Sequence, residues 1–487
     1  MLVRPRCVSL RRKLKSTVSG NGCDHSLSPG RRLVTLAIES SCDDTAVAVL
    51  SHTRRRTELL FNERICADNR AFKGVHPIIS NDAHQSALAP LVQRALLALP
   101  DAGDSSSSPS SSSSSSPSPH ICVTSSDGTL YKRRPDFVSV TRGPGILTNL
   151  SVGINMAKGL AVAWDVPLVG VHHMQAHALT PRLVAALRQE QPQSSSTSDD
   201  NVNTTHRDIS PQFPFLTLLV SGGHTQLVHS ASLTEHHVLA TTIDHAIGNL
   251  LDQTARVILP PPILASSPDV MYGRLLESFA FNTTTTTTTT TTTHPGPPPN
   301  YHDFFQPALS RMDEMTPVPT SYPWTLSLPF RDSRRLAFCF SSLHMQVHRI
   351  AEHIPPDDIP QRRCLAQHIL RAAFQHLASR LVLALQDIPG LSRDVARTLV
   401  VSGGVASNQF LKHVLRETLS ARGYPGMNIL APPVALCTDN AAMIAWAGME
   451  MFEGGWVSDL GIRAVGKWPM SEGGRDAILG VEGWMRR

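Results

Sequence analysis

Cysteines are few and scattered in this sequence. The 487-residue chain contains eight of them, and no two form a C-x-x-C pair. Neither a zinc ribbon nor a disulfide framework is therefore indicated, and a reduced, intracellular compartment fits this usage best. Long apolar runs are also lacking. No stretch approaches about 18 uninterrupted apolar residues, which argues against a membrane span.

Two common nucleotide-binding signatures are missing as well. The sequence has neither the Walker pattern nor G-x-G-x-x-G, which argues against P-loop and Rossmann proteins. Basic residues form no dense block outside the N-terminus, and the net charge is only +5 with a pI near 8.8. This balance permits a nucleic-acid partner without arguing for one.

The N-terminus, in contrast, has a marked composition. Arginine, lysine and serine are frequent there, and the first acidic residue is Asp24. This pattern is typical of a mitochondrial transit peptide, which we expect over residues 1–32. The alternative is a disordered basic tail that touches RNA.

Three low-complexity segments interrupt the globular sequence. They are a serine tract within about 101–119, a polar stretch over about 190–210 and a threonine run with prolines over about 282–300. Such tracts have too little apolar surface to offset the entropy of ordering, so we expect disordered surface loops.

The remaining sequence alternates strands with helices and hairpins, which predicts an α/β protein with mixed sheets. Four predicted strands run directly into turns rich in glycine, serine or threonine: "IESSCDDT", "TRGPGILTN", "LLVSGGHTQL" and "LVVSGGVASN". Such turns can direct backbone N–H groups at an anion. Four of them favour a phosphate or nucleotide site. Asp43 and Asp44 in the first turn either position a metal–phosphate group or close the turn.

The segment "GVHHMQAHALTPRL" contains a pair of histidines at helical spacing. His173 and His177 lie four residues apart, so both would occupy one face of a helix and could bind a metal, or could simply be partly buried. Pro181 predicts that the helix kinks or ends nearby. The glutamate of the H-E-x-x-H protease signature is absent. Asp439 in "LCTDNAAMIA" offers a third ligand or a plain helix cap.

Other polar residues allow two interpretations each. Asp244 and Asp252 lie eight apart in a segment that we expect to be helical, where they line a cleft or face solvent. Asn408 follows a glycine turn at a predicted helix start, where it is a cap or a ligand contact.

Together these motifs resemble one family, the tRNA N6-adenosine threonylcarbamoyltransferases, in particular the mitochondrial branch. Eleven segments match in the same order between about residue 33 and residue 470. They include "LAIESSCDDTAVAVL", "VTRGPGILTNLSVGINMAKGLA", "VPLVGVHHMQAHALTPRL", "FPFLTLLVSGGHTQLV", "LVVSGGVASNQFL" and "LCTDNAAMIAWAGMEMF". Three segments depart from the family pattern, namely "DHAIGNLLDQ", "FCFSSLHMQ" and the turn before "MYGRLLESFA".

The resemblance implies an actin/Hsp70-like ATPase fold with two ribonuclease-H-like subdomains around a cleft. It also implies transfer of the threonylcarbamoyl group from threonylcarbamoyl-AMP to N6 of the adenosine at position 37, beside the anticodon of tRNAs that read ANN codons. AMP is released. The alternatives are a small-molecule kinase or a nucleotide-binding chaperone of the same fold.

The resemblance further implies roles for individual residues. The metal ligands correspond to His173, His177 and Asp439, which would hold one divalent zinc or iron ion per subunit. The carboxylate important for activity corresponds to Asp43. Substrate-contacting residues correspond to Leu219, Val220, Ser221, Gly222, Gly223, Asp252, Gly273 and Asn408.

Partners and subdomains follow from the same resemblance. The expected partners are tRNA, a separate synthase that supplies threonylcarbamoyl-AMP, and a second copy of the chain, in the mitochondrial matrix. We expect a first subdomain over 33–171, a second over 172–430, and a C-terminal return to the first over 431–487.

Overall fold

The structure is a computed structural model. It describes residues 31–72, 74–102, 120–126, 128–188, 209–267, 271–281, 300–388, 391, 397–472 and 475–487. Residues 1–30 of the predicted transit peptide and nearly all of the three low-complexity segments lie outside the described residues.

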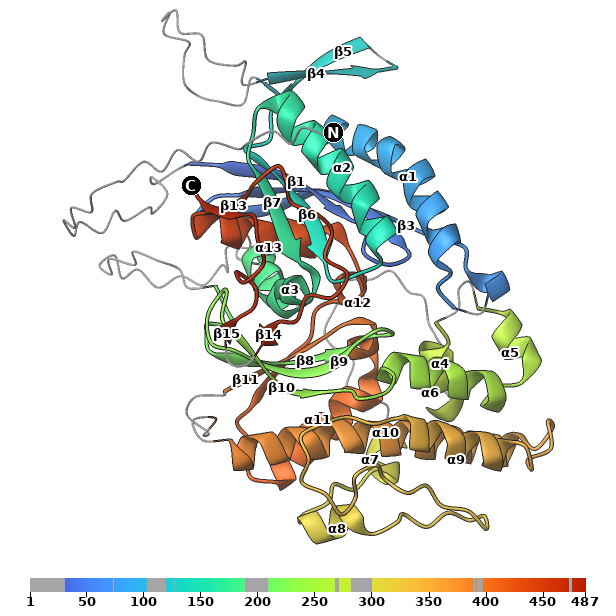
Figure 1. The fold of residues 1–487 in the computed structure, drawn as a ribbon. Helices are drawn as coiled ribbons and strands as arrows, with labels where there is room; N and C mark the ends of the chain where they lie inside the picture. The colour runs from blue at the N-terminus through green and yellow to red at the C-terminus, as the bar shows by residue number, and fades with distance from the viewer. Residues whose placement is uncertain are drawn as a thin grey trace, which may run out of the picture.

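The first half of the molecule is built on a seven-stranded mixed sheet (Figure 1). Its strands, in spatial order, are β16 (Trp484–Arg486), β13 (Trp456–Ser458), β7 (Leu168–His172), β6 (Phe137–Gly143), β1 (Leu33–Glu39), β2 (Asp44–His52) and β3 (Thr57–Cys66). Strand β1 pairs antiparallel with β2 and parallel with β6. Every residue of β1 and β2 is buried, because helices cover both faces of the sheet.

Helices α1 (Pro77–Leu97) and α2 (Leu147–Trp164) pack on one face of this sheet, and α3 (His173–Arg188) and α13 (Ala441–Glu453) cover the other. Helix α13 starts at Asn440, whose side chain accepts a hydrogen bond of 3.0 Å from the backbone N–H of Met443. The C-terminal part of the chain, with α13, β13 and β16, thus lies with the N-terminal strands.

The second half contains a five-stranded sheet covered by a helical layer (Figure 1). Its strands, in order, are β10 (His236–Thr241), β9 (Thr225–Ser230), β8 (Phe215–Val220), β11 (Thr398–Ser402) and β12 (Asn428–Leu430). The covering helices are α4 (Ile247–Ile258), α6 (Gly273–Phe281), α9 (Ser341–Ala351), α10 (Ile359–Asp387) and α11 (Gln409–Ala421). The predicted hairpin of β8 and β9 is confirmed.

Shorter elements complete the described chain: η1 (Arg70–Phe72), β4 (His120–Ser125), β5 (Gly128–Arg133), α5 (Pro261–Ala265), α7 (Asn300–Phe304), α8 (Arg311–Met315), η2 (Gly404–Ser407), α12 (Val434–Cys437), β14 (Ser471–Glu472) and β15 (Arg475–Asp476). None of the helices in the described ranges has the length and apolar character that a membrane crossing requires.

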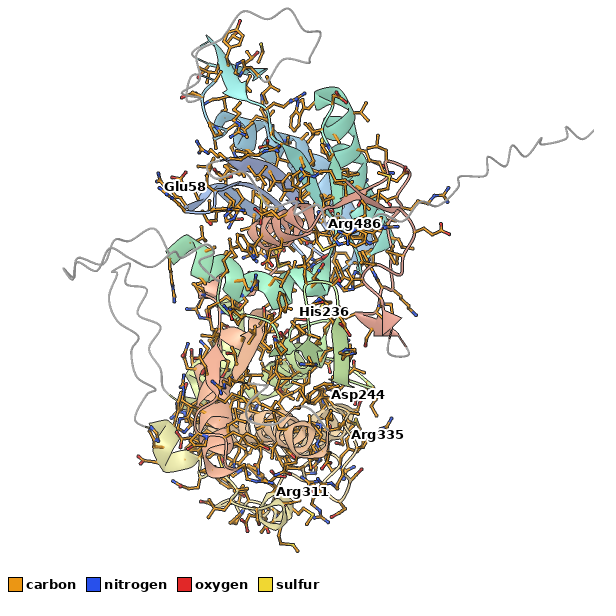
Figure 2. The ribbon with its side chains drawn as sticks, turned by 90° about the vertical axis from the view of Figure 1, so that its left-hand side faces the viewer. Glu58, His236, Asp244, Arg311, Arg335 and Arg486 are labelled. Atoms are coloured by element: carbon orange, nitrogen blue, oxygen red, sulfur yellow. The ribbon has the colours of Figure 1, made fainter. Side chains whose placement is uncertain are left out.

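Helix α3 lies between the two sheets (Figures 1 and 2). Its residues Ala176 and Leu179 pack with α13, while Met174 packs with Leu219 of β8. The helix continues through Pro181 to Arg188 rather than ending there. The histidines therefore lie where the two halves meet.

The structure corrects one expectation. Asp244 does not share a helix with Asp252, because α4 begins only at Ile247. The Asp244 carboxylate instead accepts hydrogen bonds from the backbone N–H groups of Phe340 and Ser341 at the start of α9, and these bonds hold its pKa well below the usual range despite its partial burial. It thereby joins two of the segments that depart from the family pattern, "DHAIGNLLDQ" and "FCFSSLHMQ".

Candidate functional site

The four glycine-rich turns meet in two pairs at the strand ends. In the first half, the backbone N–H of Ile146 donates to the carbonyl oxygen of Ser41 at 2.9 Å. A Cβ atom at Gly145 would lie 2.6 Å from the same oxygen, so only glycine permits this approach. In the second half, Gly403 has φ +97° and a Cβ there would collide with the carbonyl group of Val220.

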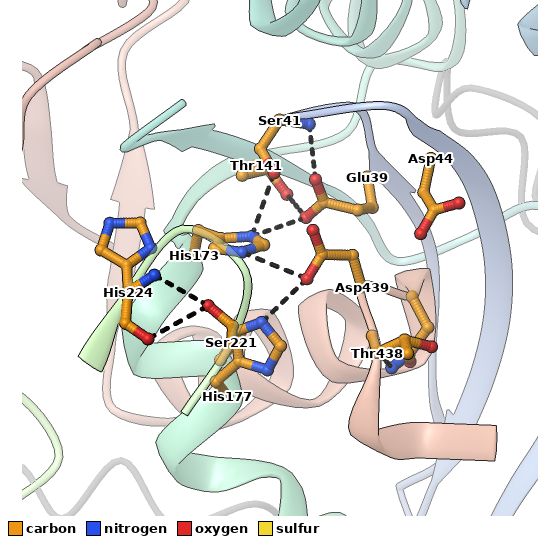
Figure 3. Close-up of polar contacts among 12 residues, drawn as sticks. Glu39, Ser41, Asp44, Thr141, His173, His177, Ser221, His224, Thr438 and Asp439 are labelled. Carbon is orange, nitrogen blue, oxygen red and sulfur yellow. Dashed lines mark hydrogen bonds and ion pairs between the residues drawn. The ribbon is translucent and has the colours of Figure 1, made fainter. Parts of the chain in front are cut away.

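A cluster of two histidines and one aspartate, here called the inner cluster, lies between these pairs of turns (Figure 3). It consists of His173, His177 and Asp439, whose ligand atoms lie within 4.8 Å of one another. The Nε2 atoms of His173 and His177 are 3.5 and 3.0 Å from Oδ1 of Asp439. The structure thus brings together the three residues predicted as metal ligands.

Two helix starts position the three residues of the inner cluster. His173 is the first residue of α3, directly after β7, and His177 follows one turn later on the same face. Asp439 precedes Asn440, the N-cap of α13, and its side chain is 25% exposed. The aspartate is not itself the cap, so its carboxylate is available to the histidines.

Glu39, at the end of β1, fixes the orientation of His173. Its Oε2 lies 3.1 Å from Nδ1 of His173 and accepts a 2.6 Å hydrogen bond from the Thr141 hydroxyl, while its Oε1 accepts one of 2.5 Å from the Ser41 backbone N–H. A carboxylate on one ring nitrogen leaves the other nitrogen, Nε2, directed at Asp439 (Figure 3). The sequence interpretation missed Glu39, although an acid at the end of an otherwise apolar strand is a recognisable signal.

Two carboxylates, Asp439 of the inner cluster and the adjacent Glu39, face His173. Burial disfavours the charged form of His173, but Asp439 and Glu39 outweigh it and raise its pKa to about 10. Burial likewise opposes ionisation of Asp439, yet the two histidines hold its pKa well below the usual range. A site that retains an extra proton at neutral pH suits a divalent cation, whose binding would release that proton.

His224 borders the inner cluster without joining it (Figure 3). Burial, followed by the charges of His173 and His177, lowers its pKa to about 4, so it stays neutral at pH 7. Its backbone N–H donates to the Ser221 hydroxyl at 3.0 Å, which closes the turn after β8.

Asp43 and Asp44 differ in their surroundings. Asp43 accepts a hydrogen bond of 3.3 Å from Asn69, and burial, with Asp439 nearby, raises its pKa. Asp44 pairs with Arg64 at 3.0 Å, and burial raises the pKa of Asp44 to about 7 although Arg64 acts in the opposite direction. Asp43 is therefore the carboxylate that remains without a cationic partner among the described ion pairs.

The turn after β8 has open space in front of its glycines. A Cβ atom added at Gly222 or Gly223 would meet nothing within 4 Å. The side chains of Leu219 and Val220, in contrast, are buried in the core. Of this predicted substrate-contacting segment, the backbone and the exposed glycines can reach a ligand, and the two apolar side chains cannot.

Asp252, in the middle of α4, lies beside two connected helix starts, those of α6 at Gly273 and of α11 at Asn408. The backbone N–H of Gly273, at the start of α6, donates to Oδ1 of Asp252 at 3.0 Å. Asn408 caps α11, accepting 2.9 Å from the N–H of Leu411. Glu277, which the sequence interpretation missed, connects the two, because it lies on α6 and accepts from the backbone N–H of Phe410 on α11 at 2.9 Å.

The arrangement defines a class of protein: two mixed α/β halves with a His/His/Asp cluster at the glycine-rich strand ends where the halves meet. A family model described as tRNA N6-adenosine threonylcarbamoyltransferase matches residues 125–199, 200–295 and 299–446. The chain belongs to this family, and membership gives it the actin-like fold.

Curated relatives agree with this family. The mitochondrial tRNA N6-adenosine threonylcarbamoyltransferase of Schizosaccharomyces pombe is 32% identical over 470 residues, covering 94% of this chain and 90% of that protein. The tRNA N6-adenosine threonylcarbamoyltransferase of Bartonella henselae is 30% identical over 447 residues, covering 90% of this chain and 95% of its own length. That of Chelativorans sp. is 29% identical over 447 residues, with the same coverage.

Proposed function

We propose that this chain transfers the threonylcarbamoyl group from threonylcarbamoyl-AMP to N6 of adenosine 37 in tRNAs that read ANN codons, with release of AMP. The observation that carries the proposal is the inner cluster, which places His173, His177 and Asp439 together at the glycine-rich turns of a member of this family. Attack by the N6 amine on the carbamoyl carbon forms the new C–N bond, and the bond to the phosphate oxygen of AMP breaks.

The inner cluster is the proposed metal site. Two imidazole nitrogens and one carboxylate oxygen are donors that suit zinc or iron, and three protein ligands leave positions open for substrate oxygens. When bound, the ion would polarise a phosphate or carbamoyl oxygen. Glu39 acts as a positioning residue, because its contact with Nδ1 of His173 directs the other ring nitrogen toward the ion.

The turns and helix starts are the proposed substrate contacts. Within the segment from Leu219 to Gly223, the backbone N–H groups of Gly222 and Gly223 would bind the phosphate of the nucleotide, since these two glycines leave the approach open. Asp252 on α4, and Gly273 and Asn408 at the neighbouring helix starts, would contact the rest of the substrate. Asp43 would contribute a carboxylate to the same site.

Several properties of the working protein belong to the same proposal. We place it in the mitochondrial matrix, with residues 1–32 as the transit peptide, since a curated relative is the mitochondrial protein of its organism. It would act as a homodimer on substrate supplied by a separate synthase. Its subdomains would span 33–171 and 172–430, with 431–487 returning to the first.

Incubation of the purified chain with threonylcarbamoyl-AMP and unmodified tRNA tests the reaction. We expect threonylcarbamoyladenosine in the tRNA by mass spectrometry, and AMP in equal amount. A tRNA with another base at position 37 is the matched control and should stay unmodified. Absence of product where a curated relative forms it would overturn the proposal, and phosphorylation of a small molecule from ATP would favour a kinase instead.

A further inference from the structure

A second group of histidines and a carboxylate, here called the outer cluster, lies on the helical layer of the second half. It consists of His302 on α7 together with His413 and Glu417 on α11, and one ligand atom from each lies within 4.8 Å of the others. His413 and Glu417 are four residues apart, so they share one face of α11. The rings of His302 and His413 meet edge to face at 4.6 Å.

His413 has an unsatisfied nitrogen in this cluster. The residue is only 2% exposed, and its Nε2 atom is buried without a hydrogen-bond partner. A buried imidazole nitrogen of this kind destabilises the folded protein unless something binds it. Of the surrounding rings, Phe305 and Phe410 carry no polar atom, and the hydroxyl of Tyr301 already donates to Glu277. The neighbouring His302 and Glu417 are the groups able to share a ligand with it.

We propose that the outer cluster is a second divalent-metal site, with His302, His413 and Glu417 as ligands to an ion of the zinc type. Two imidazoles and a carboxylate are a donor set that zinc accepts at about 2.0–2.2 Å. Bound at those lengths, ligand atoms lie roughly 3.3–3.6 Å apart in tetrahedral geometry. The exposed His302 and the partly exposed Glu417 can close the remaining distance by side-chain rotation, while His413 stays fixed.

The ion would connect two segments that already share one buried carboxylate. The Tyr301 hydroxyl, next to His302, donates to Oε1 of Glu277 at 2.7 Å. The same oxygen accepts from the backbone N–H groups of Gln409 and Phe410 at the start of α11. A metal between His302 and His413 adds a second link between α7 and α11. Its role is thus structural, outside the inner cluster, and it does not depend on the proposed reaction.

Zinc counting on the full chain tests the proposal. The protein is stripped with a chelator, dialysed against a low concentration of Zn²⁺, and its zinc content is measured by inductively coupled plasma mass spectrometry. We expect His302→Gln and Glu417→Gln each to bind one zinc ion fewer per chain than the wild type. His302 is exposed, so its replacement leaves the fold intact.

His353→Gln is the matched control, since His353 is also an exposed helix-end histidine, with a backbone contact to Arg349 and no place in either cluster. It should bind as much zinc as the wild type. Equal zinc content in the wild type and His302→Gln would overturn the proposal. Loss of zinc in His353→Gln to the same extent would also overturn it, by showing adventitious surface binding.

Discussion

The inner and outer clusters have the same kind of donors but different surroundings. In the inner cluster, His173 is held by Glu39, which is itself held by Thr141 and Ser41. In the outer cluster, His302 is exposed, and no buried carboxylate orients its ring among the described contacts. His413 and Glu417 lie on one face of α11, and His302 lies on the short surface helix α7. Buried partners thus fix the orientation of a ligand in the inner cluster, which suits a catalytic metal site. The outer cluster has no such partner for His302 among the described contacts and suits a structural site that connects two helices.

The two clusters also differ in what they connect. The inner cluster joins α3, which lies between the sheets, to the turn before α13, so it belongs to the junction of the two halves. The outer cluster joins α7 to α11 within one half. Loss of an inner ligand should therefore affect the reaction, and loss of an outer ligand should affect local stability.

The largest effect is expected for His177→Ala. The variant lacks one of the three proposed metal ligands. Loss of a residue that only hydrogen-bonds to a metal ligand costs up to about 100-fold, so loss of the ligand itself should lower the rate of threonylcarbamoyladenosine formation by at least about 100-fold. Product formation is measured by mass spectrometry, with circular dichroism to check folding. A folded variant with the wild-type rate would show that the inner cluster does not serve the reaction.

Glu39→Gln tests the orientation that separates the two clusters. The amide keeps the shape of the side chain but loses the negative charge that faces Nδ1 of His173, so metal affinity at the inner cluster should fall by about 10–100-fold. Competition with a metal-binding dye measures the affinity. The matched control is Glu58→Gln, an acid of β3 that pairs with Arg56 and lies outside the inner cluster. An equal loss in both variants would contradict a specific role for Glu39.

Gly403→Ala tests the close-packed turns on which the inner cluster depends. Alanine is strained at the positive φ of Gly403, and its Cβ would collide with the carbonyl group of Val220. The free energy of unfolding should therefore fall by about 1–3 kcal/mol. The adjacent Gly404→Ala is the control, because a Cβ there would meet only Thr438, at 3.8 Å. Urea unfolding measures both, and equal stabilities would show that the two turns do not approach as described.

Two buried histidines outside both clusters, His236 and His376, should make the free energy of unfolding depend on pH. Burial lowers the pKa of His236 to about 4 and that of His376 to about 3, against about 6.5 in the unfolded chain. Their contribution to stability is complete above pH 6.5 and is lost as the pH falls through 4, since the unfolded chain binds more protons. Urea unfolding from pH 7 to pH 4 should show this decline, and His376→Gln should reduce its slope. A free energy of unfolding that rises on acidification would be contrary to this account.

The smallest effect on the reaction is expected for His302→Gln. This variant should form product within about 2-fold of the wild-type rate, because the outer cluster contacts no group of the inner cluster among the described interactions. The mass-spectrometric assay under saturating substrate measures it. A loss comparable to that of His177→Ala would remove the distinction between the clusters.

Much of the fold follows from local patterns in the sequence. Apolar segments such as 33–39 and 215–220 form the predicted strands, and the glycine turns after them appear where expected. Spacing alone placed His173 and His177 on one helix face. Asp439 could be joined to them only through the family resemblance, because the contact links residues far apart in the chain.

The buried carboxylates could not be predicted in the same way. Glu39 stands out in the sequence only by its position at the end of an apolar strand, and Glu277 looks like an ordinary acid. The roles of both depend on which backbone N–H groups and side chains the fold brings to them. Asp244 was wrongly placed on a helix because its segment has helical composition, whereas its carboxylate holds the start of α9. The outer cluster likewise exists only once α7 packs against α11.

Anomalous X-ray diffraction from crystals of the metal-loaded protein, recorded at the absorption edge of the bound metal, tests the central claim most directly. The account predicts a peak about 2.0–2.2 Å from Nε2 of His173, Nε2 of His177 and a carboxylate oxygen of Asp439. Loaded protein without a peak between these three side chains would contradict it.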